Sequence, residues 1–122
     1  MASSHPDRTV MVHVRKELPD MHLWSSLDNV IICLINDSTV CTDTPAEQFY
    51  SKFIHELMPK SKFGAVELSD ILRVCIVYRL GGTYVDTDVI QLASFNESIE
   101  DFVLNQYGRA VNTLFHFTSK GN

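Results

Sequence analysis

The stretch from Ser69 to Ile90, SDILRVCIVYRLGGTYVDTDVI, decides the fold of this chain. Its first half carries apolar side chains at helical spacing, which predicts a helix from about residue 65 or 66 to residue 80. The residues expected to face inward are Leu68, Ile71, Leu72, Cys75 and Tyr78. Gly81 stands where helices commonly end in a left-handed cap, and Gly82 extends that conformational freedom. Residues 83–85 are then expected to begin a strand.

Two carboxylates, Asp86 and Asp88, follow at the end of this predicted strand. Side chains two residues apart on an extended strand point to the same side, so both carboxylates are expected to converge, with Thr87 turned away. Two like charges that close repel each other unless a divalent cation lies beside them. Oxygen ligands suit magnesium or manganese, above all where phosphate oxygens complete the coordination. The alternative is a solvated turn that carries two acidic residues.

A second polar group lies upstream, on the predicted helix. Asp70 and Arg73 are three residues apart and share a helix face, and Ser69 adjoins them. These residues could form an intrahelical ion pair beside a helix cap, or they could belong to a binding site. Their own spacing leaves both interpretations open.

Length, charge and hydropathy limit the class of protein. The 122 residues favour one domain, and the formal net charge is −5. The sequence has no basic tract, so nothing in it suggests a nucleic-acid-binding face. No apolar run approaches the roughly 20 residues of a membrane span. The N-terminal residues MASSHPDRTV also lack the apolar region of a signal peptide. We therefore expect neither a transmembrane nor a signal segment in this chain.

Further strands are predicted from apolar, β-branched runs. Residues 9–14 (TVMVHV) and 30–35 (VIICLI) do not alternate cleanly, which suits strands covered on both faces in a parallel sheet. Residues 110–117 (AVNTLFHF) are expected to form a later strand. Together with the helices, these strands predict an α/β layered domain. Ligands of open α/β sheets collect beyond the carboxyl ends of strands, where the two aspartates are expected.

Two further helices are predicted. One begins at Thr44-Pro45-Ala46-Glu47, where Thr44 is expected to cap the helix and Pro45 to occupy its first position. This helix should end near Met58, before Pro59. A short helix is expected over residues 98–104.

The three cysteines have no metal-like spacing, so a structural zinc site is not expected. Cys33 and Cys75 lie inside apolar runs and are expected to be buried thiols. Cys41 lies in a polar connection. In an oxidising compartment it could pair with either of the others, and the sequence leaves this open.

The stretch from Ser69 to Ile90 resembles the signature of glycosyltransferases whose sugar-binding region contains an Asp-x-Asp (DXD) motif. The elements of that signature are Ser-Asp, an Arg three residues after that Asp, Gly-Gly, Tyr and Asp-x-Asp, and all are present in order. Within the family, the chain is most similar to the animal α-1,4-galactosyltransferase and α-1,4-N-acetylglucosaminyltransferase-like group. The supporting residues are Asp43-Thr44-Pro45, Phe49, Tyr50 and the downstream Ala110-Val111-Asn112.

This resemblance implies a Rossmann-like, nucleotide-sugar-binding α/β domain of the GT-A type, incomplete at both ends. Residues 1–122 would form the donor-binding half of a partial catalytic domain. The implied activity is transfer of a hexose or N-acetylhexosamine from a UDP-sugar to a glycolipid or glycan acceptor. The reaction would retain anomeric configuration, give an α-1,4 linkage and require Mn²⁺ or Mg²⁺. A role in glycosphingolipid biosynthesis follows from the same likeness.

Site residues carry over by position. Asp88 would be the main metal ligand, and Asp86 would contact the metal, the ribose or the donor sugar. Asp70 and Arg73 would bind sugar hydroxyls or hold the donor, and Tyr84 would shape its approach. No convincing protein nucleophile is present, so same-face attack by the acceptor is the preferred route to retention.

The resemblance also implies a cellular setting. Relatives of this kind are Golgi proteins anchored by one N-terminal membrane segment, which this chain lacks. Because the family's catalytic domain is much longer, the chain resembles a fragment, and a truncated, inactive product is one alternative. A remote alternative is a phosphohydrolase of the haloacid dehalogenase type, in which the first Asp of Asp-x-Asp is the nucleophile.

Overall fold

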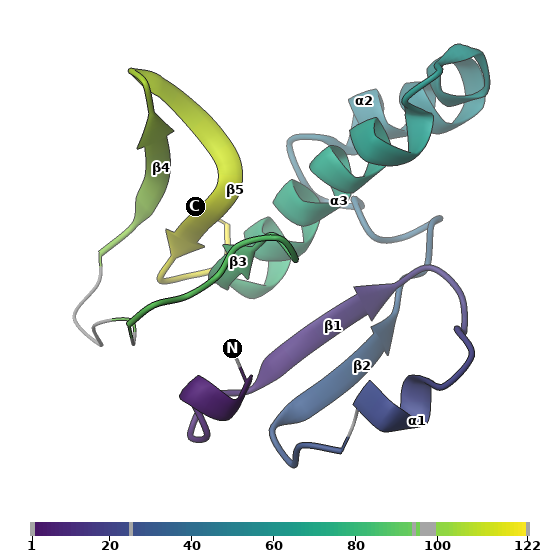
Figure 1. The fold of residues 1–122 in the computed structure, drawn as a ribbon. Helices are drawn as coiled ribbons and strands as arrows, with labels where there is room; N and C mark the ends of the chain where they lie inside the picture. The colour runs from purple at the N-terminus through teal and green to yellow at the C-terminus, as the bar shows by residue number, and fades with distance from the viewer. Residues whose placement is uncertain (1, 25, 94, 96–99, 122) are drawn as a thin grey trace. The chain divides into compact units, whose positions relative to one another are not determined.

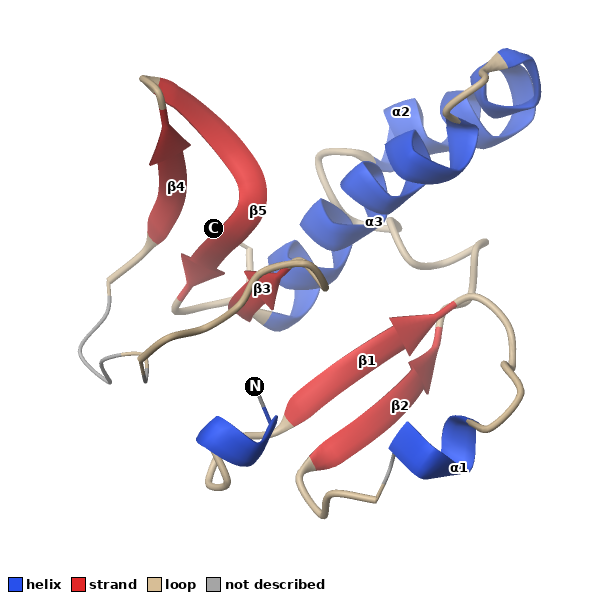
Figure 2. Ribbon diagram, in the orientation of Figure 1, coloured by secondary structure: helices blue, strands red, loops and turns tan. Residues whose placement is uncertain are grey.

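A computed structural model describes residues 2–24, 26–93, 95 and 100–121, and the chain divides into two compact units (Figure 1). The first unit comprises Met1–Asp37 and Ile90–Asn96, and the second comprises Ser38–Val89 and Glu97–Asn122. The mixture of helices and strands agrees with the predicted α/β class (Figure 2). The single partial domain expected for residues 1–122 stays a prediction.

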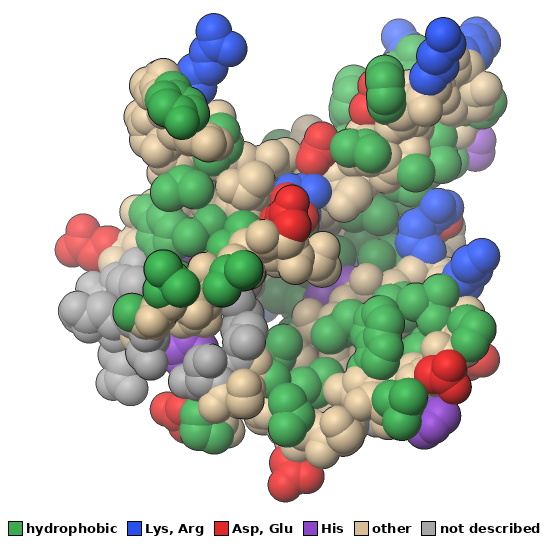
Figure 3. Space-filling model, viewed as in Figure 1, with side chains coloured by type: hydrophobic (Ala, Val, Ile, Leu, Met, Phe, Trp, Pro, Cys, Tyr) green, Lys and Arg blue, Asp and Glu red, His purple; other side chains and the backbone are tan. Residues whose placement is uncertain are grey.

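The first unit is built on two parallel strands, β1 (Val10–Val14) and β2 (Val30–Leu34), as the apolar runs predicted. A 3₁₀ turn (Ala2–Ser4) precedes β1, and the short helix α1 (Met21–Trp24) lies between the strands. The expectation that both faces of these strands are covered is wrong for the described residues. Met11 is 45% exposed and Ile31 is 50% exposed. Hydrophobic side chains accordingly gather over β1 and β2 in Figure 3.

In the second unit, a helical segment precedes the long helix. It consists of α2 (Glu47–Lys52), a π-helical turn (Phe53–Leu57) and a 3₁₀ turn (Met58–Lys60). The predicted start at Thr44-Pro45 is two residues too early, because the Thr44 hydroxyl donates to the Cys41 carbonyl and accepts from the Ala46 N–H within a turn. The helical backbone also continues past Met58, since Pro59 falls in the first turn of the 3₁₀ segment, where its missing N–H is tolerated.

The long helix α3 (Gly64–Leu80) confirms the prediction to within two residues. Its buried residues are Gly64, Leu68, Leu72, Arg73, Cys75 and Val77. Gly81 ends the helix with φ +69°, a backbone conformation that residues with a Cβ atom rarely adopt. Strand β3 (Gly82–Val85) follows at once, so the helix and strand predicted from one stretch of sequence are both present.

Strand β3 belongs to an antiparallel sheet of order β3-β5-β4. The other strands are β4 (Phe102–Gln106) and β5 (Arg109–Phe117), and α3 packs against β3 and β5. The strand predicted over residues 110–117 is confirmed. The helix predicted over 98–104 is wrong where it can be compared, because residues 102–104 belong to β4, while residues 98 and 99 lie outside the described part. Among the residues that the structure describes, parallel pairing of the kind expected in a Rossmann-like sheet is limited to β1 and β2.

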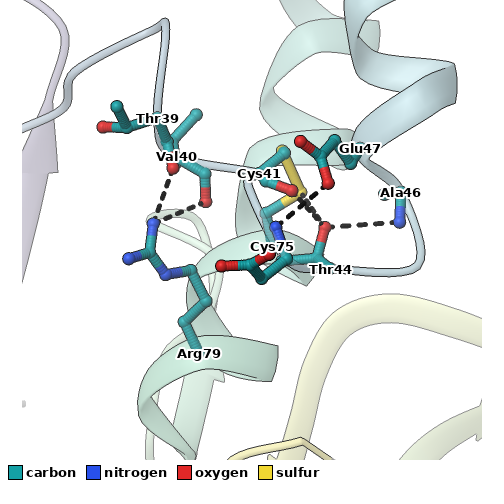
Figure 4. The surroundings of a disulfide bond; sticks show 9 residues. Thr39, Val40, Cys41, Thr44, Ala46, Glu47, Cys75 and Arg79 are labelled. Carbon is teal, nitrogen blue, oxygen red and sulfur yellow. Dashed lines mark hydrogen bonds between the residues drawn. A yellow bond between two sulfur atoms is a disulfide. The ribbon is translucent and has the colours of Figure 1, made fainter.

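A disulfide joins Cys41 to Cys75 across a sequence separation of 34 residues (Figure 4). Cys75 was predicted to be a buried thiol. It is buried, but it is oxidised, because the turn that carries Cys41 packs onto α3. Arg79 on the same helix donates to the carbonyl oxygens of Thr39 and Val40. The disulfide and these hydrogen bonds therefore both attach the turn to α3. Cys33 is a free, partly buried cysteine.

Among the described residues, the structure contains no helix that is both long and apolar enough to cross a bilayer.

Candidate donor-binding site

Arg73 is the centre of a polar network between α3 and the antiparallel sheet. Its side chain is only 7% exposed, and burying a charge so fully requires partners that compensate it. Two carboxylates do so: Nη1 lies 3.1 Å from Asp86 Oδ2, and Nη2 lies 3.1 Å from Asp70 Oδ1. The intrahelical pair predicted from the i, i+3 spacing is therefore present. It is one half of an arrangement in which one guanidinium bridges two carboxylates.

Arg73 donates four hydrogen bonds within the protein. Nε donates to the Ser69 carbonyl at 3.3 Å, and Nη2 also donates to the Ser69 hydroxyl at 3.3 Å. Nη1 donates to the Asn112 carbonyl at 3.0 Å in addition to Asp86. A guanidinium has five N–H donors; four of them make these hydrogen bonds, and Nη2 also makes the ion-pair contact with Asp70. Arg73 is thus held rigidly in one orientation.

Asp86 is fixed directly after β3. Its Oδ2 accepts from Arg73, and its Oδ1 accepts from the Tyr84 hydroxyl at 2.9 Å. Its backbone N–H donates to the Thr113 carbonyl of β5 at 2.9 Å, which extends the strand pairing by one residue. The carboxylate is therefore oriented from both sides.

Tyr84 connects Arg73 and Asp86. Its ring lies 4.6 Å from the Arg73 guanidinium carbon, in a cation–π arrangement, and stacks on Phe115 with a centroid separation of 5.3 Å. Burial of the phenol and its hydrogen bond to Asp86 raise the pKa of Tyr84 to about 12. The hydroxyl therefore stays protonated at neutral pH and remains a donor to Asp86.

Asp88 differs from Asp86 in its solvent exposure and in its contacts. It lies in a turn closed by a bond from the Val89 N–H to the Asp86 carbonyl, and it is exposed. Within the described part of the chain it makes no hydrogen bond or ion pair. The extended geometry assumed in predicting that the two carboxylates converge is wrong, because β3 ends at Val85. One aspartate is anchored and the other is free to bind a ligand.

Asn112 on β5 is a residue of the network whose role the sequence did not reveal. Its side-chain amide donates to Asp70 Oδ1 at 3.0 Å, while its carbonyl accepts from Arg73. The sequence signal for it was only the resemblance of Ala110-Val111-Asn112 to a family strand. Its partners are far away in sequence, at separations of 42 and 39 residues.

Asp70 also faces open space. Its side chain is 45% exposed and lines an open groove of about 560 Å³, whose walls include Phe49, Phe53 and Ile71. A ligand could therefore reach Asp70 without displacing a core side chain.

The carboxylates fit a hard divalent ion that takes only part of its coordination from protein. No group of three or more His, Cys, Asp or Glu side chains gathers at one point among the described residues. Magnesium is usually held by one or two carboxylates together with phosphate oxygens and water. The free Asp88 beside the anchored Asp86 is compatible with that kind of site.

Comparison with known proteins identifies the family. Residues 1–107 match the glycosyltransferase sugar-binding region containing a DXD motif. The chain is 32% identical over 101 residues to lactosylceramide 4-alpha-galactosyltransferase of Mus musculus, covering 75% of this chain and 27% of the relative. It is 29% identical over 101 residues to alpha-1,4-N-acetylglucosaminyltransferase of Homo sapiens, covering 81% and 28%. An uncharacterized Arabidopsis thaliana protein is 33% identical over 99 residues, covering 79% and 15%.

The chain therefore spans less than a third of the length of each of these relatives. No solved structure is significantly similar to it. The family match agrees with the resemblance drawn from Ser-Asp, Arg73, Gly81-Gly82, Tyr84 and the two aspartates, and it favours that interpretation over the phosphohydrolase alternative. The chain belongs to the glycosyltransferase family defined by a sugar-binding region with a DXD motif.

Proposed function

We propose that this chain provides the donor-binding part of a metal-dependent hexosyltransferase. The donor would be a UDP-sugar carrying a hexose or N-acetylhexosamine, and the acceptor a glycolipid or other glycan. Transfer would form an α-1,4 linkage with retention, by same-face attack of the acceptor. The names of the two animal relatives, a 4-alpha-galactosyltransferase and an alpha-1,4-N-acetylglucosaminyltransferase, support both the sugar class and the linkage.

One observation carries the proposal: an anchored carboxylate is followed, two residues later, by a free one. Asp86 is oriented by Arg73 and Tyr84, while Asp88 is exposed and unpaired among the described residues. In a purely structural acidic turn, the buried guanidinium and the tyrosine would contribute stability alone. A binding site gains a fixed ligand geometry.

Each residue has a role that follows from its surroundings. Asp88 and Asp86 are the proposed ligands of Mn²⁺ or Mg²⁺, and the donor-binding set is Asp70, Arg73, Tyr84 and Asp86. Arg73 belongs to this set as the cation that holds two carboxylates in place. A bound divalent ion would neutralise charge developing on the departing UDP. Tyr84 orients Asp86 by donating a hydrogen bond from its hydroxyl group to Oδ1.

The disulfide supports a cellular location. Disulfides persist in the secretory pathway and outside the cell, and they are rare in the cytosol. The Cys41–Cys75 bond is therefore consistent with the Golgi lumen as the compartment in which the full-length protein works.

The test is UDP binding to the full-length protein, measured by calorimetry with and without Mn²⁺. Asp88→Asn should abolish most of the manganese-dependent gain in affinity, because it removes the free carboxylate and keeps its shape. Glu56→Gln removes an exposed carboxylate of the same unit outside this network and serves as the matched control. Equal manganese dependence in wild type and Asp88→Asn would refute the metal assignment.

A further inference from the structure

The five contacts of Arg73 have a consequence for donor recognition. Four hydrogen bonds and the ion-pair contact with Asp70 engage all three nitrogens of this guanidinium, so Arg73 is poorly placed to donate to a sugar hydroxyl. It is also only 7% exposed. Its influence on a bound donor must pass through the groups that it holds, which are Asp70 and Asp86.

Asp70 is the member of the network that can reach a sugar. It is 45% exposed and lines the open groove. The contacts from Arg73 Nη2 and Asn112 Nδ2 both end on Oδ1, at 3.1 and 3.0 Å. The hydrogen bond from Asn112 and the ion pair with Arg73 both hold Oδ1, which leaves Oδ2 to accept from a ligand. A carboxylate is an acceptor only, so the partner it suits is a hydroxyl group, such as those of a hexose ring.

We propose that Asn112 is a positioning residue for recognition of the donor sugar. This inference rests on the proposed function. The Asn112 side chain fixes Asp70, its backbone carbonyl fixes Arg73, and Asp70 Oδ2 accepts from a hydroxyl of the transferred sugar. Asn112 therefore acts on the sugar of the donor, whereas Asp88 acts on its diphosphate through the metal.

A binding experiment on the full-length protein with Mn²⁺ distinguishes the role of Asn112 from that of Asp88. The probes are UDP, UDP-galactose and UDP-N-acetylglucosamine. Asn112→Ala should weaken binding of the preferred UDP-sugar about tenfold, the loss expected for one hydrogen bond to a charged group, and leave binding of UDP unchanged. Asn105→Ala is the matched control, because it changes an exposed asparagine of the same sheet that bonds the Gly108 N–H in the β4–β5 turn.

A second variant tests positioning rather than general stability. Asn112→Asp replaces the amide donor with a carboxylate, which repels Asp70 at neutral pH. At lower pH the new carboxyl group becomes protonated and can again donate to Asp70 Oδ1. The ratio of UDP-sugar affinity to UDP affinity should therefore recover on acidification in Asn112→Asp and stay low in Asn112→Ala. Thermal melts of both variants report whether the fold is intact.

The outcomes are distinct. If wild type binds neither UDP nor a UDP-sugar, the proposed function fails and this inference fails with it. If wild type binds the donor and Asn112→Ala weakens UDP and UDP-sugar equally, or neither of them, the proposed function stands and the role of Asn112 is overturned. Selective loss of UDP-sugar binding, with recovery on acidification in Asn112→Asp alone, supports it.

Discussion

The Cys41–Cys75 disulfide gives the sharpest prediction about stability. The perturbation is the double substitution Cys41→Ala/Cys75→Ala, which opens a covalent loop with a sequence separation of 34 residues. In the chain-entropy account, closing a loop of that length removes freedom from the unfolded chain worth about 3.8 kcal/mol at room temperature. Because Cys41 and Cys75 are 2% and 0% exposed, losing their sulfur atoms also leaves unfilled space in the core. With roughly 0.8 kcal/mol for each buried sulfur atom lost, we expect a total loss of about 5 kcal/mol.

The assay is urea unfolding followed by far-ultraviolet circular dichroism, which reports on α2 and α3 of the same unit. Oxidised wild type, reduced wild type and the double variant are compared, and Cys33→Ser is the control because Cys33 is outside the disulfide. Reduction should lower the unfolding midpoint nearly as much as the double substitution does. Three free thiols in the purified wild type, or a midpoint indifferent to reductant, would refute the reasoning.

Three further substitutions test the surroundings of the site. Arg73→Lys keeps the charge but loses the planar guanidinium with its five donors. It should lower the free energy of unfolding in urea by about 2–3 kcal/mol and weaken UDP-sugar binding. An unchanged unfolding midpoint would mean that the Arg73 network does not stabilise the fold. Gly81→Ala should cost about 1–3 kcal/mol, because φ is +69° and a Cβ would lie 3.3 Å from the Ser119 carbonyl carbon. Tyr84 has a folded-state pKa of about 12, above its ordinary 10.0, so its contribution to stability is full below pH 10.0 and is lost as pH rises through about 12. Tyr84→Phe should therefore melt with a shallower alkaline decline than wild type, and parallel declines would contradict this.

Local signals were sufficient for the elements that carry the site. The helix from Gly64 to Leu80 and the strand after it follow from apolar spacing, and Gly81 ends the helix because few other residues adopt its backbone conformation. The parallel pairing of β1 and β2 also follows, since neither strand alternates. The helix, its end at Gly81 and the strand after it depend on residues that are close together in sequence.

The β4–β5 hairpin shows where local reasoning failed. Residues 102–104 were predicted as helix, yet they form a strand that turns at Tyr107 and Gly108, with φ +53° and +78°. Positive φ at both positions marks the two-residue turn that hairpins favour, in which Asn-Gly is the usual sequence. Tyr107 hides the signal, because an aromatic residue with positive φ is uncommon. Gly108 was the one residue of this turn whose type indicated a hairpin.

The network around Arg73 could not be predicted from spacing alone. Its bonds to Asp86 and to the Asn112 carbonyl span 13 and 39 residues, and they exist only because α3 packs on the β3–β5 pair. The disulfide has the same origin. In both cases the sequence supplied candidates, and tertiary packing chose the partners.

The network also changes the electrostatic argument for a metal. The sequence suggested that Asp86 and Asp88 need a cation between them, but the structure gives Asp86 a cation of its own in Arg73. Asp70, Asp86 and Asp88 with the single guanidinium still leave two net negative formal charges at the end of β3. An anionic diphosphate would be repelled by that excess, and a divalent ion would cancel it. The main role of the proposed metal is therefore to offset the repulsion between this negatively charged surface and the diphosphate of a nucleotide sugar. Offsetting the repulsion between Asp86 and Asp88 is a smaller part of its role.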